Sequence, residues 1–323
     1  MHKHDLICIG NAIVDIIVNV EESFLDKLSF PKGSMQIITN EEFEKIFEQI
    51  SKFQTISGGS AANTAVGFSS FGGAAAFIGK VGNDKFGRLF EESIKKENIF
   101  YSSNIDSNMS DLTSKSIVLV TKDAERTMCT FLGASTDIHL SEIDFSMFDK
   151  SKIVYFEGYL YDTETSKNTI LEICKKIKNK NIICSLSLSD SFCIERHKND
   201  FLNLIREHID IVFCNHDELK ALFNLDFQSS LASLRDIVKR GCVTLGSKGS
   251  IVFDDNEVLN ISAISNKNVL DTTGAGDLYA SGYLFGLSKK YSLHDCGQLG
   301  SLASSEIISY LGARPNKRLK NLV

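Results

Sequence analysis

The sequence predicts an α/β fold: a central, mostly parallel sheet with helices on both faces, and a small β-sheet lid. Apolar runs of strand length recur along the chain, and segments with helical spacing separate them, as in βαβ units. Residues 11–39 and about 100–133 break this alternation and look like strands joined by polar turns, which predicts the lid. At 323 residues the chain is long enough for one large domain with an appendage.

The strands of the large sheet are expected at short apolar runs. The first is DLICIG at 5–10, and AAAFIGKVG at 74–82 predicts another. Such near-continuous apolar runs are typical of parallel strands with both faces covered. Four later runs have the same character, namely KIVYFEG, NIICSLS, DIVFCN and CVTLG.

Two early segments have the spacing of amphipathic helices. Residues 40–51 carry apolar side chains at i, i+3, i+4 and i+7, and Thr39 with Glu42 predicts a capping box at their start. Residues 84–99 predict a second helix. Its core face is expected to consist of Phe86, Leu89, Phe90 and Ile94.

The lid is expected from strands at about 11–39 and 100–133, inserted into a single domain that spans residues 1–323. Its clearest piece is SIVLVT-KDAE-RTMCTFL, which predicts a β-hairpin at 116–132. Antiparallel strands of this kind, with no helix between them, predict a small sheet over one end of the larger fold. Such an appendage can close over a bound ligand.

Composition excludes several functional classes. The net charge of −6 leaves no basic excess for nucleic acid or an anionic membrane. Asp5, Asn11, Asp15 and Asn19 interrupt the N-terminal apolar run, which therefore predicts a buried strand and neither a signal peptide nor a membrane span. Eight scattered cysteines without CxxC spacing favour buried thiols in a cytoplasmic protein over disulfides or metal ligands. The mildly basic tail at 312–323 is expected to be solvated.

Residues 271–277, DTTGAGD, lie between an apolar, strand-like stretch and a predicted helix. Glycines at a helix N-terminus let several N–H groups point at one anion, and phosphate is the commonest such anion. Asp277 would repel that phosphate unless it takes the proton of a hydroxyl that attacks it. On spacing alone, a tight turn in which Asp277 complements the helix dipole fits equally well. The chain has no Walker A loop, and Tyr279 stands where a dinucleotide motif has its third glycine.

Three further clusters allow a structural or a functional interpretation. In ISGGSAANTAVGFSSFGG at 56–73, Gly58 and Gly59 precede a predicted helix of small residues that carries Asn63. This helix is either a tightly packed core helix or one wall of a ligand site. Asn215 and Glu218 follow a strand and are already explained by a helix cap, so a functional role needs independent support. VTLGSKGSIVF at 243–253 predicts a hairpin.

Taken in this order, the four clusters resemble the ribokinase-like (PfkB) carbohydrate and nucleoside kinase family. DTTGAGD with a small-residue helix after it is similar to the family's C-terminal signature. GGSAANTAVGFSSFGGAAAFIGKVGNDKFG is similar to its N-terminal signature. The resemblance covers nearly the whole chain, and it implies a ribokinase-like fold, ATP as phosphoryl donor and Mg²⁺ as cofactor.

The resemblance also implies roles for individual residues. Asp277 matches the catalytic base, and the backbone of Gly274, Ala275 and Gly276 matches the anion hole. The residues matched to ATP and magnesium are Asn215, Glu218, Thr244, Gly246 and Gly249, with Glu218 reaching Mg²⁺ through water. The residues matched to a monovalent cation such as K⁺ are Asp271 and Thr273.

On the acceptor side, the resemblance implies contacts with substrate hydroxyls. The matched residues are Asp15, Gly58, Gly59 and Asn63, with Arg126 and Glu157 as further candidates. For Arg126, a solvated charge on a hairpin is an equally good interpretation.

The acceptor is expected to be a small molecule with a primary hydroxyl. GNAIVDI is similar to the adenosine kinase branch, which favours the 5′-hydroxyl of a purine nucleoside. GGSAAN lies between the sugar and nucleoside patterns, and Leu278 with Tyr279 departs from the commoner pair after the catalytic Asp. Two alternatives stay open: a sugar kinase acting on ribose, fructose or a related sugar, and a non-catalytic nucleoside or nucleotide sensor. The enzyme is expected to be a monomer or a homodimer joined through the lid.

Overall fold

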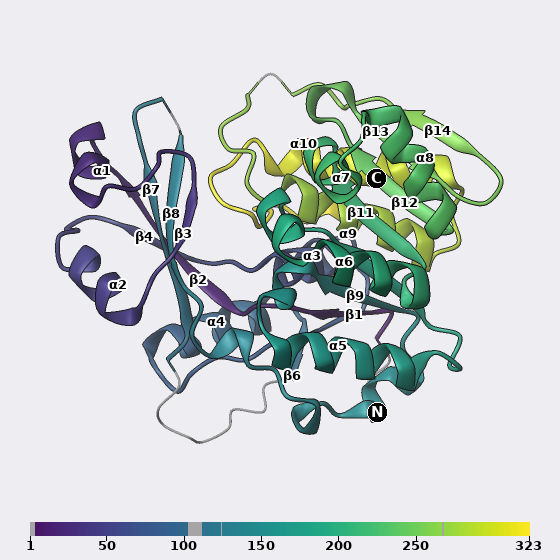
Figure 1. The fold of residues 1–323 in the computed structure, drawn as a ribbon, viewed down its shortest axis with the longest axis horizontal. Helices are drawn as coiled ribbons and strands as arrows, with labels where there is room; N and C mark the ends of the chain where they lie inside the picture. Colours follow the sequence, from purple (N-terminus) through teal and green to yellow (C-terminus); the bar gives the residue numbers. More distant parts are fainter. Residues whose placement is uncertain (1–3, 103–111, 124, 267) are drawn as a thin grey trace.

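The computed structural model describes residues 4–102, 112–123, 125–266 and 268–323. Figure 1 shows a large body that holds most of the chain and a smaller sheet at one end of it. Of the stretch 100–133 that was predicted to form part of the lid, residues 103–111 and 124 lie outside the described residues. Nowhere in the described part does a helix reach the length and apolar character needed to cross a membrane.

In the described residues, the large sheet has nine strands in the order β14-β13-β12-β11-β10-β9-β1-β5-β6. Neighbouring strands from β6 to β12 pair in parallel, and β13 and β14 pair antiparallel at the far edge. This confirms the predicted mostly parallel sheet and the hairpin at 243–253. The strands are β1 (Leu6–Ile9), β5 (Ala75–Ile78), β6 (Phe100–Ser102), β9 (Ile153–Glu157), β10 (Ile183–Ser187), β11 (Ile211–Asn215), β12 (Arg240–Thr244), β13 (Ser250–Phe253) and β14 (Val258–Ile261).

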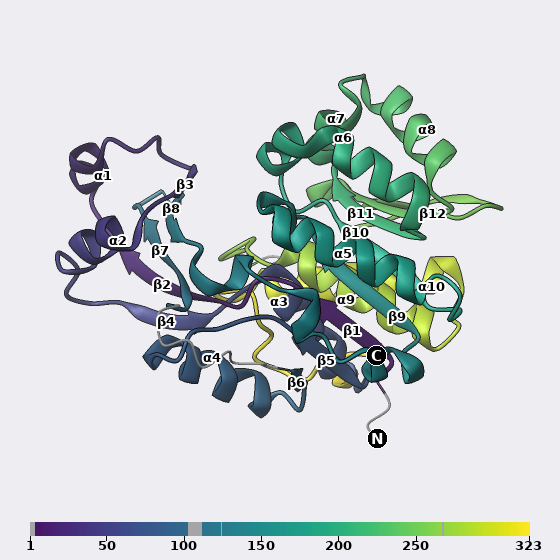
Figure 2. The same ribbon diagram turned by 60° about the horizontal axis from the view of Figure 1, so that its bottom comes forward.

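Both faces of the large sheet are buried, which explains the near-continuous apolar runs. In β1, Leu6 and Cys8 belong to one hydrophobic cluster, whereas Ile7 and Ile9 belong to another on the opposite face. The first face is covered by α3 (Ser60–Ser70), α4 (Lys85–Lys96), α9 (Ala275–Ser288) and α10 (Leu293–Ile307) (Figure 2). The second face is covered by α5 (Glu164–Ile177), α6 (Ser191–His208), α7 (His216–Phe223) and α8 (Phe227–Ile237).

The small sheet has the strand order β3-β8-β7-β2-β4 and stands apart from the large one (Figure 1). β7 and β8 pair antiparallel, which confirms the predicted hairpin. β2 pairs in parallel with β7, and β3 with β8, so the sheet is mixed and the expectation of antiparallel strands was only partly right. The strands are β2 (Ile13–Asn19), β3 (Met35–Ile37), β4 (Gln54–Ser57), β7 (Ser114–Val120) and β8 (Arg126–Phe131).

The limits predicted for the lid were wrong in three details. A helix, α1 (Glu22–Leu28), lies within 11–39, where only strands and turns were expected, and it buries Leu25. β6 opens the stretch 100–133 but pairs with β5 in the large sheet. β4 lies outside both stretches and pairs with β2. Strands of three or four residues are defined by their partners, which the local pattern does not reveal.

The helix expected at 40–51 is α2 (Asn40–Phe47), which lies beside the small sheet (Figure 1). It begins with the predicted capping box, because Thr39 Oγ1 accepts from the Glu42 N–H at 3.2 Å and the Glu42 carboxylate accepts from the Thr39 N–H at 2.8 Å. The helix predicted at 84–99 is α4, which runs over Lys85–Lys96 with Asp84 as its N-cap. Of its expected core face, Phe86, Phe90 and Ile94 are buried, and Leu89 is partly buried.

The C-terminal segment, which was expected to be solvated, packs against the body instead. Leu319 is fully buried, and its N–H donates to Ser70 Oγ at 2.8 Å. Arg314 reaches α3 and α4 with its guanidinium. One buried leucine and a few side-chain hydrogen bonds thus anchor a segment whose composition is polar.

Candidate functional site

A cavity of about 530 Å³ is lined by residues of both sheets. The small sheet contributes side chains of β2, β7 and β8, such as Asp15, Ser116 and Thr130. The large sheet contributes residues at the carboxyl ends of its parallel strands, namely Glu157, Ser187, Asn215 and Thr244. This edge of an open α/β sheet is where such folds bind ligands.

The cavity brings together most of the residues that the sequence singled out. They are Asp15, Gly59, Asn63, Glu157, Asn215, Glu218, Thr244, Gly246, Thr273, Gly274, Ala275, Gly276 and Asp277. Gly58, Arg126, Gly249 and Asp271 are not among its lining residues. Gly249 has φ 93°, and a Cβ there would lie 2.0 Å from the Ile261 carbonyl oxygen, so close backbone packing accounts for this glycine.

The turn before α9 is built differently from the expected strand-turn-helix. Val269 and Leu270 are exposed and form no strand. The Leu270 N–H donates to the Ile308 carbonyl at 2.8 Å, so the turn is tied to the end of α10. Gly274 adopts φ 77°, and a Cβ there would lie 2.6 Å from the Cβ of Ala313, so both the backbone and the space require glycine.

The first turn of α9 lines the cavity and has backbone N–H groups that make no helical hydrogen bond. The Leu278 N–H donates to the Gly274 carbonyl at 2.8 Å, which is the first hydrogen bond of the helix. The N–H groups of Gly276 and Asp277 come before it in the chain and have no acceptor within the helix. The Ala275 N–H instead donates within the preceding turn, at 3.2 Å. A phosphate can therefore use the N–H groups of Gly276 and Asp277 directly, whereas Ala275 must first give up its turn bond.

The carboxylate of Asp277 lines the cavity and is held from two sides. Asn63 Nδ2 donates to Oδ2 at 2.9 Å, and Ser60 Oγ donates to Oδ1 at 2.7 Å. Burial raises the pKa of Asp277 to about 6, while these two hydrogen bonds oppose the rise. The group is thus ionised at neutral pH and is a stronger base than an ordinary aspartate, as a general base requires.

Glu157 is a second carboxylate at the cavity and is fully buried. Its Oε1 accepts from the Asn11 N–H at 2.8 Å, and its Oε2 accepts from the Ala61 N–H at 2.7 Å. Burial raises the pKa of Glu157 to about 7, although both hydrogen bonds favour the ionised form. The carboxylate therefore braces the first turn of α3 against the loop that follows β1.

Asp15 borders the cavity from the small sheet. Burial raises its pKa to about 6, and the positive charges of Arg314 and Arg126 oppose that rise. The paired glycines lie close by: a Cβ on Gly58 would lie 2.4 Å from Asp15 Oδ2, and Gly59 adopts φ 95°. Only glycine lets the chain pass so close to this carboxylate.

At the end of β11, Asn215 caps α7. Asn215 Oδ1 accepts from the Glu218 N–H at 2.8 Å, and Glu218 Oε2 accepts from the Asn215 N–H at 3.0 Å, which confirms the capping interpretation. Both residues also line the cavity. Burial raises the pKa of Glu218 to about 7, and the nearby Asp190 and Asp277 add to the rise.

The residues around Glu218 fit a magnesium ion held through water. Mg²⁺ prefers oxygen ligands and keeps several waters while it is bound by one or two carboxylates and substrate phosphates. Within the described ranges no cluster of three or more metal-ligating side chains exists that could hold a metal by itself. The buried carboxylate of Glu218 beside the amide of Asn215 matches binding of Mg²⁺ through water.

Asp271 and Arg126 form an ion pair between the turn before α9 and the start of β8. Asp271 also accepts from the Thr273 N–H at 2.9 Å and the Gly312 N–H at 2.7 Å. The guanidinium of Arg126 thus pairs with the carboxylate of Asp271, to which the family resemblance assigned a monovalent cation. In this conformation the residues do not fit such a cation, and a site at Asp271 and Thr273 requires that Arg126 move away.

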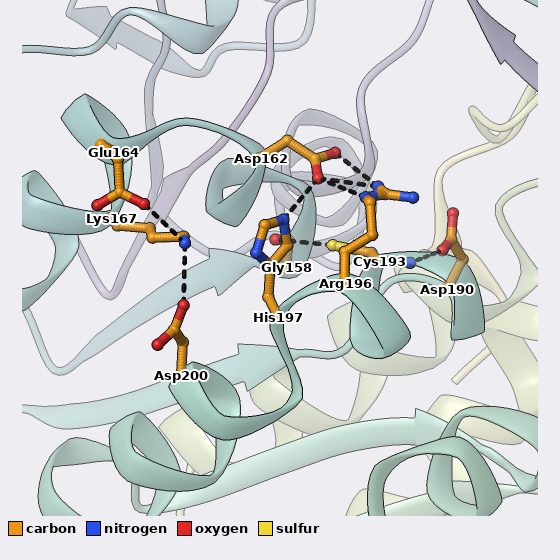
Figure 3. A network of polar contacts seen from close by, with 9 residues as sticks. All are labelled: Gly158, Asp162, Glu164, Lys167, Asp190, Cys193, Arg196, His197 and Asp200. Carbon is orange, nitrogen blue, oxygen red and sulfur yellow. Dashed lines mark hydrogen bonds and ion pairs between the residues drawn. The ribbon is translucent and has the colours of Figure 1, made fainter.

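A polar network borders the cavity beyond β9 (Figure 3). Arg196 donates to both carboxylate oxygens of Asp162, at 2.8 and 2.9 Å, and His197 Nε2 lies 2.9 Å from Oδ1. Figure 3 shows both side chains directed at Asp162, which itself lines the cavity. Lys167 joins α5 to α6 through Asp200 at 2.9 Å. The network therefore fixes α6 beside the cavity.

Sequence reasoning missed several residues of the site. Ser60 was not among the residues expected at the site, yet its hydroxyl donates to Asp277, 217 positions away. Tyr159 and Asp162 line the cavity just beyond a predicted strand, without a motif of their own. Arg314 lies in the tail that was expected to be solvated. No local pattern marks these residues, because their role depends on neighbours that only the fold supplies.

Comparison with known proteins gives close relatives over the full length. A solved structure of adenosine kinase from Sinorhizobium meliloti is 38% identical, covers 99% of this chain and 98% of its own, and superposes with a TM-score of 0.92. A probable sugar kinase from Rhizobium etli CFN 42 is 36% identical, covers 100% of this chain and 98% of its own, and gives a TM-score of 0.94. A nucleoside kinase from Methanocaldococcus jannaschii is 28% identical over 96% of this chain and 92% of its own length.

The pattern of the pfkB family carbohydrate kinases matches residues 3–319, nearly the whole chain. The architecture of the two sheets agrees with the ribokinase-like fold of the solved relatives. The chain therefore belongs to the pfkB family of carbohydrate kinases and is a phosphotransferase that acts on a hydroxyl group.

Proposed function

We propose that this enzyme transfers the γ-phosphate of ATP to the 5′-hydroxyl of a purine nucleoside. The observation that carries the proposal is the carboxylate of Asp277, which lines the cavity beside the N–H groups at the start of α9. A base and an anion site within one helical turn suit the attack of a hydroxyl on a phosphoryl group. The similarity to the adenosine kinase from Sinorhizobium meliloti supports a nucleoside as the acceptor.

The part of the cavity under the small sheet suits the nucleoside. Asp15 and Asn63 offer hydrogen bonds to ribose hydroxyls. Apolar side chains add surface around them, which a purine ring would fill and a bare sugar would not. These side chains are Ile13, Met35, Met128 and Leu132.

The part of the cavity at the ends of β11 and β12 suits ATP and its metal. Thr244 and Gly246 line it, and Gly246 adopts φ 59°, which turns the chain sharply after β12. Glu218 would hold Mg²⁺ through water, and Asn215 fixes the position of the Glu218 carboxylate. When bound, the metal supplies positive charge that neutralises the phosphate oxygens.

The residues of this chain would carry the transfer as follows. Ser60 and Asn63 hold the carboxylate of Asp277, which accepts the proton of the 5′-hydroxyl. The hydroxyl oxygen bonds to the γ-phosphorus while the bond to the departing ADP oxygen breaks. The N–H groups of Gly276 and Asp277 bind the anionic phosphoryl oxygens, and the small sheet would exclude water.

A sugar kinase is the second candidate, supported by the 36% identity to the probable sugar kinase from Rhizobium etli. It would use the same base and anion site on a free sugar such as ribose or fructose. A non-catalytic sensor is disfavoured, because a sensor has no use for a carboxylate that repels the bound phosphate.

We also propose that the enzyme is cytoplasmic and that it is a monomer or a homodimer. All eight cysteines are buried and unpaired, as in a reducing cytoplasm. The enzyme would be a monomer, or a homodimer joined through the exposed edges of the small sheet at β3 and β4.

An acceptor panel tests the substrate. ADP release is measured with ATP, Mg²⁺ and either adenosine, ribose or fructose, and the proposal expects turnover with adenosine at the highest kcat/KM. Turnover with a free sugar but not with adenosine would decide for the sugar kinase. Binding of adenosine by calorimetry without any turnover would decide for the sensor.

A further inference from the structure

Arg314 connects three elements behind the acceptor side of the cavity. It belongs to the C-terminal segment, and its guanidinium donates to Asn63 Oδ1 on α3 at 3.4 Å and to the Gly58 carbonyl at 3.3 Å. A third hydrogen bond reaches Ser93 Oγ on α4 at 2.6 Å. The group also lies over the ring of Phe90, with 5.7 Å between Cζ and the ring centroid.

These three hydrogen bonds all go to neutral oxygen atoms, so the charge of Arg314 is not matched by a directly bonded carboxylate. Burial lowers the pKa of Arg314 to about 10, while the charges of Glu97 and Asp15 oppose that change. The guanidinium therefore stays protonated at neutral pH. Its charge acts on Asp15 across the site and favours the ionised form of that carboxylate.

The amide of Asn63 has two possible orientations, and its neighbours distinguish them. In the orientation found, Nδ2 donates to Asp277 Oδ2 and Oδ1 accepts from Arg314. A flipped amide would direct its oxygen at the Asp277 carboxylate and its NH₂ group at the guanidinium. Both contacts would then be repulsive, since a carboxylate only accepts hydrogen bonds and a guanidinium only donates them.

We propose that Arg314 is a positioning residue for phosphoryl transfer, which acts through Asn63 to hold the carboxylate of Asp277. This inference rests on the proposed function, because Asp277 is a catalytic base only in a kinase that acts on a hydroxyl. Arg314 is not among the residues that line the cavity. Its effect must therefore disappear when Asn63 can no longer transmit it.

A double-mutant cycle tests this coupling. The variants are Arg314→Met, Asn63→Ala and the pair together, and kcat and KM are measured with adenosine and ATP. Arg314→Met is expected to lower kcat/KM for adenosine by about tenfold to a hundredfold, the scale of a lost hydrogen bond from a charged group. In the Asn63→Ala background, Arg314→Met should lower kcat/KM for adenosine by less than a third of the factor seen in the parent. Equal effects in both backgrounds, or an unchanged kcat/KM in Arg314→Met, would overturn the inference.

A matched control separates this role from simple anchoring of the tail. Arg318 lies in the same segment and pairs with Glu97 at 3.6 Å, away from the cavity. Arg318→Met is expected to leave kcat and both KM values within about twofold of the parent. If Arg314→Met does not fold, Arg314→Lys takes its place in the cycle, since it keeps the charge and loses the planar fork.

A readout independent of turnover keeps the two proposals apart. The side-chain NH₂ signals of Asn63 are assigned by NMR from their loss in Asn63→Ala, and Arg314→Met should shift them while Arg318→Met should not. Unshifted Asn63 signals would overturn the positioning role even in an active enzyme. A parent enzyme that releases no ADP with any acceptor would instead overturn the proposed function, whatever the NMR result.

Discussion

Two influences act on the carboxylate of Asp277 in opposite directions. The N-terminus of α9 and the hydrogen bonds from Ser60 and Asn63 stabilise its ionised form. Burial in the cavity wall destabilises that form more strongly, so the pKa rises to about 6. At this value the group is ionised at neutral pH and still accepts a proton more readily than an exposed aspartate does.

The pH profile of Ser60→Ala tests this balance. Asp277 must be ionised to act as a base, so kcat/KM of the parent is expected to fall as the pH drops through about 6. Loss of the Ser60 hydrogen bond should raise the pKa of Asp277 and move this acid limb upward by roughly one unit. The control is Ser69→Ala on the same helix, because Ser69 Oγ donates to the Glu97 carbonyl and not to the site. An acid limb that stays in place in Ser60→Ala would contradict the account.

At the scale of elements, the ion pair of Arg126 and Asp271 joins β8 to the turn before α9. Asp271 is buried and Arg126 is largely buried, so loss of either side chain would leave the other charge buried and unpaired. It holds the small sheet against the phosphate side of the cavity. The attachment of the small sheet to the turn before α9 therefore depends in part on one arginine in the hairpin.

Arg126→Met is expected to loosen this attachment of the small sheet. The acceptor KM should rise by about threefold to tenfold, because the cavity wall formed by the small sheet is held less firmly. Lys122→Met is the matched control, since Lys122 belongs to the same hairpin but pairs with Glu21 at the surface. An acceptor KM that is the same in both variants would show that the pair does not hold the sheet.

Elements with strong periodicity could be predicted from the sequence. The apolar run of β9 and the capping box at Thr39 are local features, and both were found as expected. β4 could not be predicted, because QTIS is a strand only through its pairing with β2. The same holds for Arg314 and Ser60, whose partners lie more than two hundred positions away along the chain.

At the scale of the whole molecule, the cavity concentrates four carboxylates with raised pKa values. Burial raises the pKa of Asp15 and Asp277 to about 6, and that of Glu157 and Glu218 to about 7. The unfolded chain releases these protons at lower pH than the native protein does. At a pH between the pKa values of the unfolded chain and those of the native protein, the native state therefore binds more protons than the unfolded state.

Stability of the ligand-free enzyme is consequently expected to fall as the pH rises from about 4.5 to 7. The free energy of unfolding, measured with urea, should be lower at pH 8 than at pH 5.5 by several kcal/mol. Glu157→Gln removes one of the titrating groups and should reduce this difference. Stability that is constant, or that rises with pH across this window, would contradict the raised pKa values.

Asp277→Asn removes the proposed base of the nucleoside kinase and nearly preserves the shape of the side chain. Turnover of adenosine with ATP and Mg²⁺ is measured beside the thermal shift that adenosine causes. We expect kcat to fall by about 10²–10⁴-fold, the usual contribution of a general base, while the thermal shift persists. Near-normal turnover in Asp277→Asn, with the protein folded and adenosine bound, would contradict the role of Asp277 as the base.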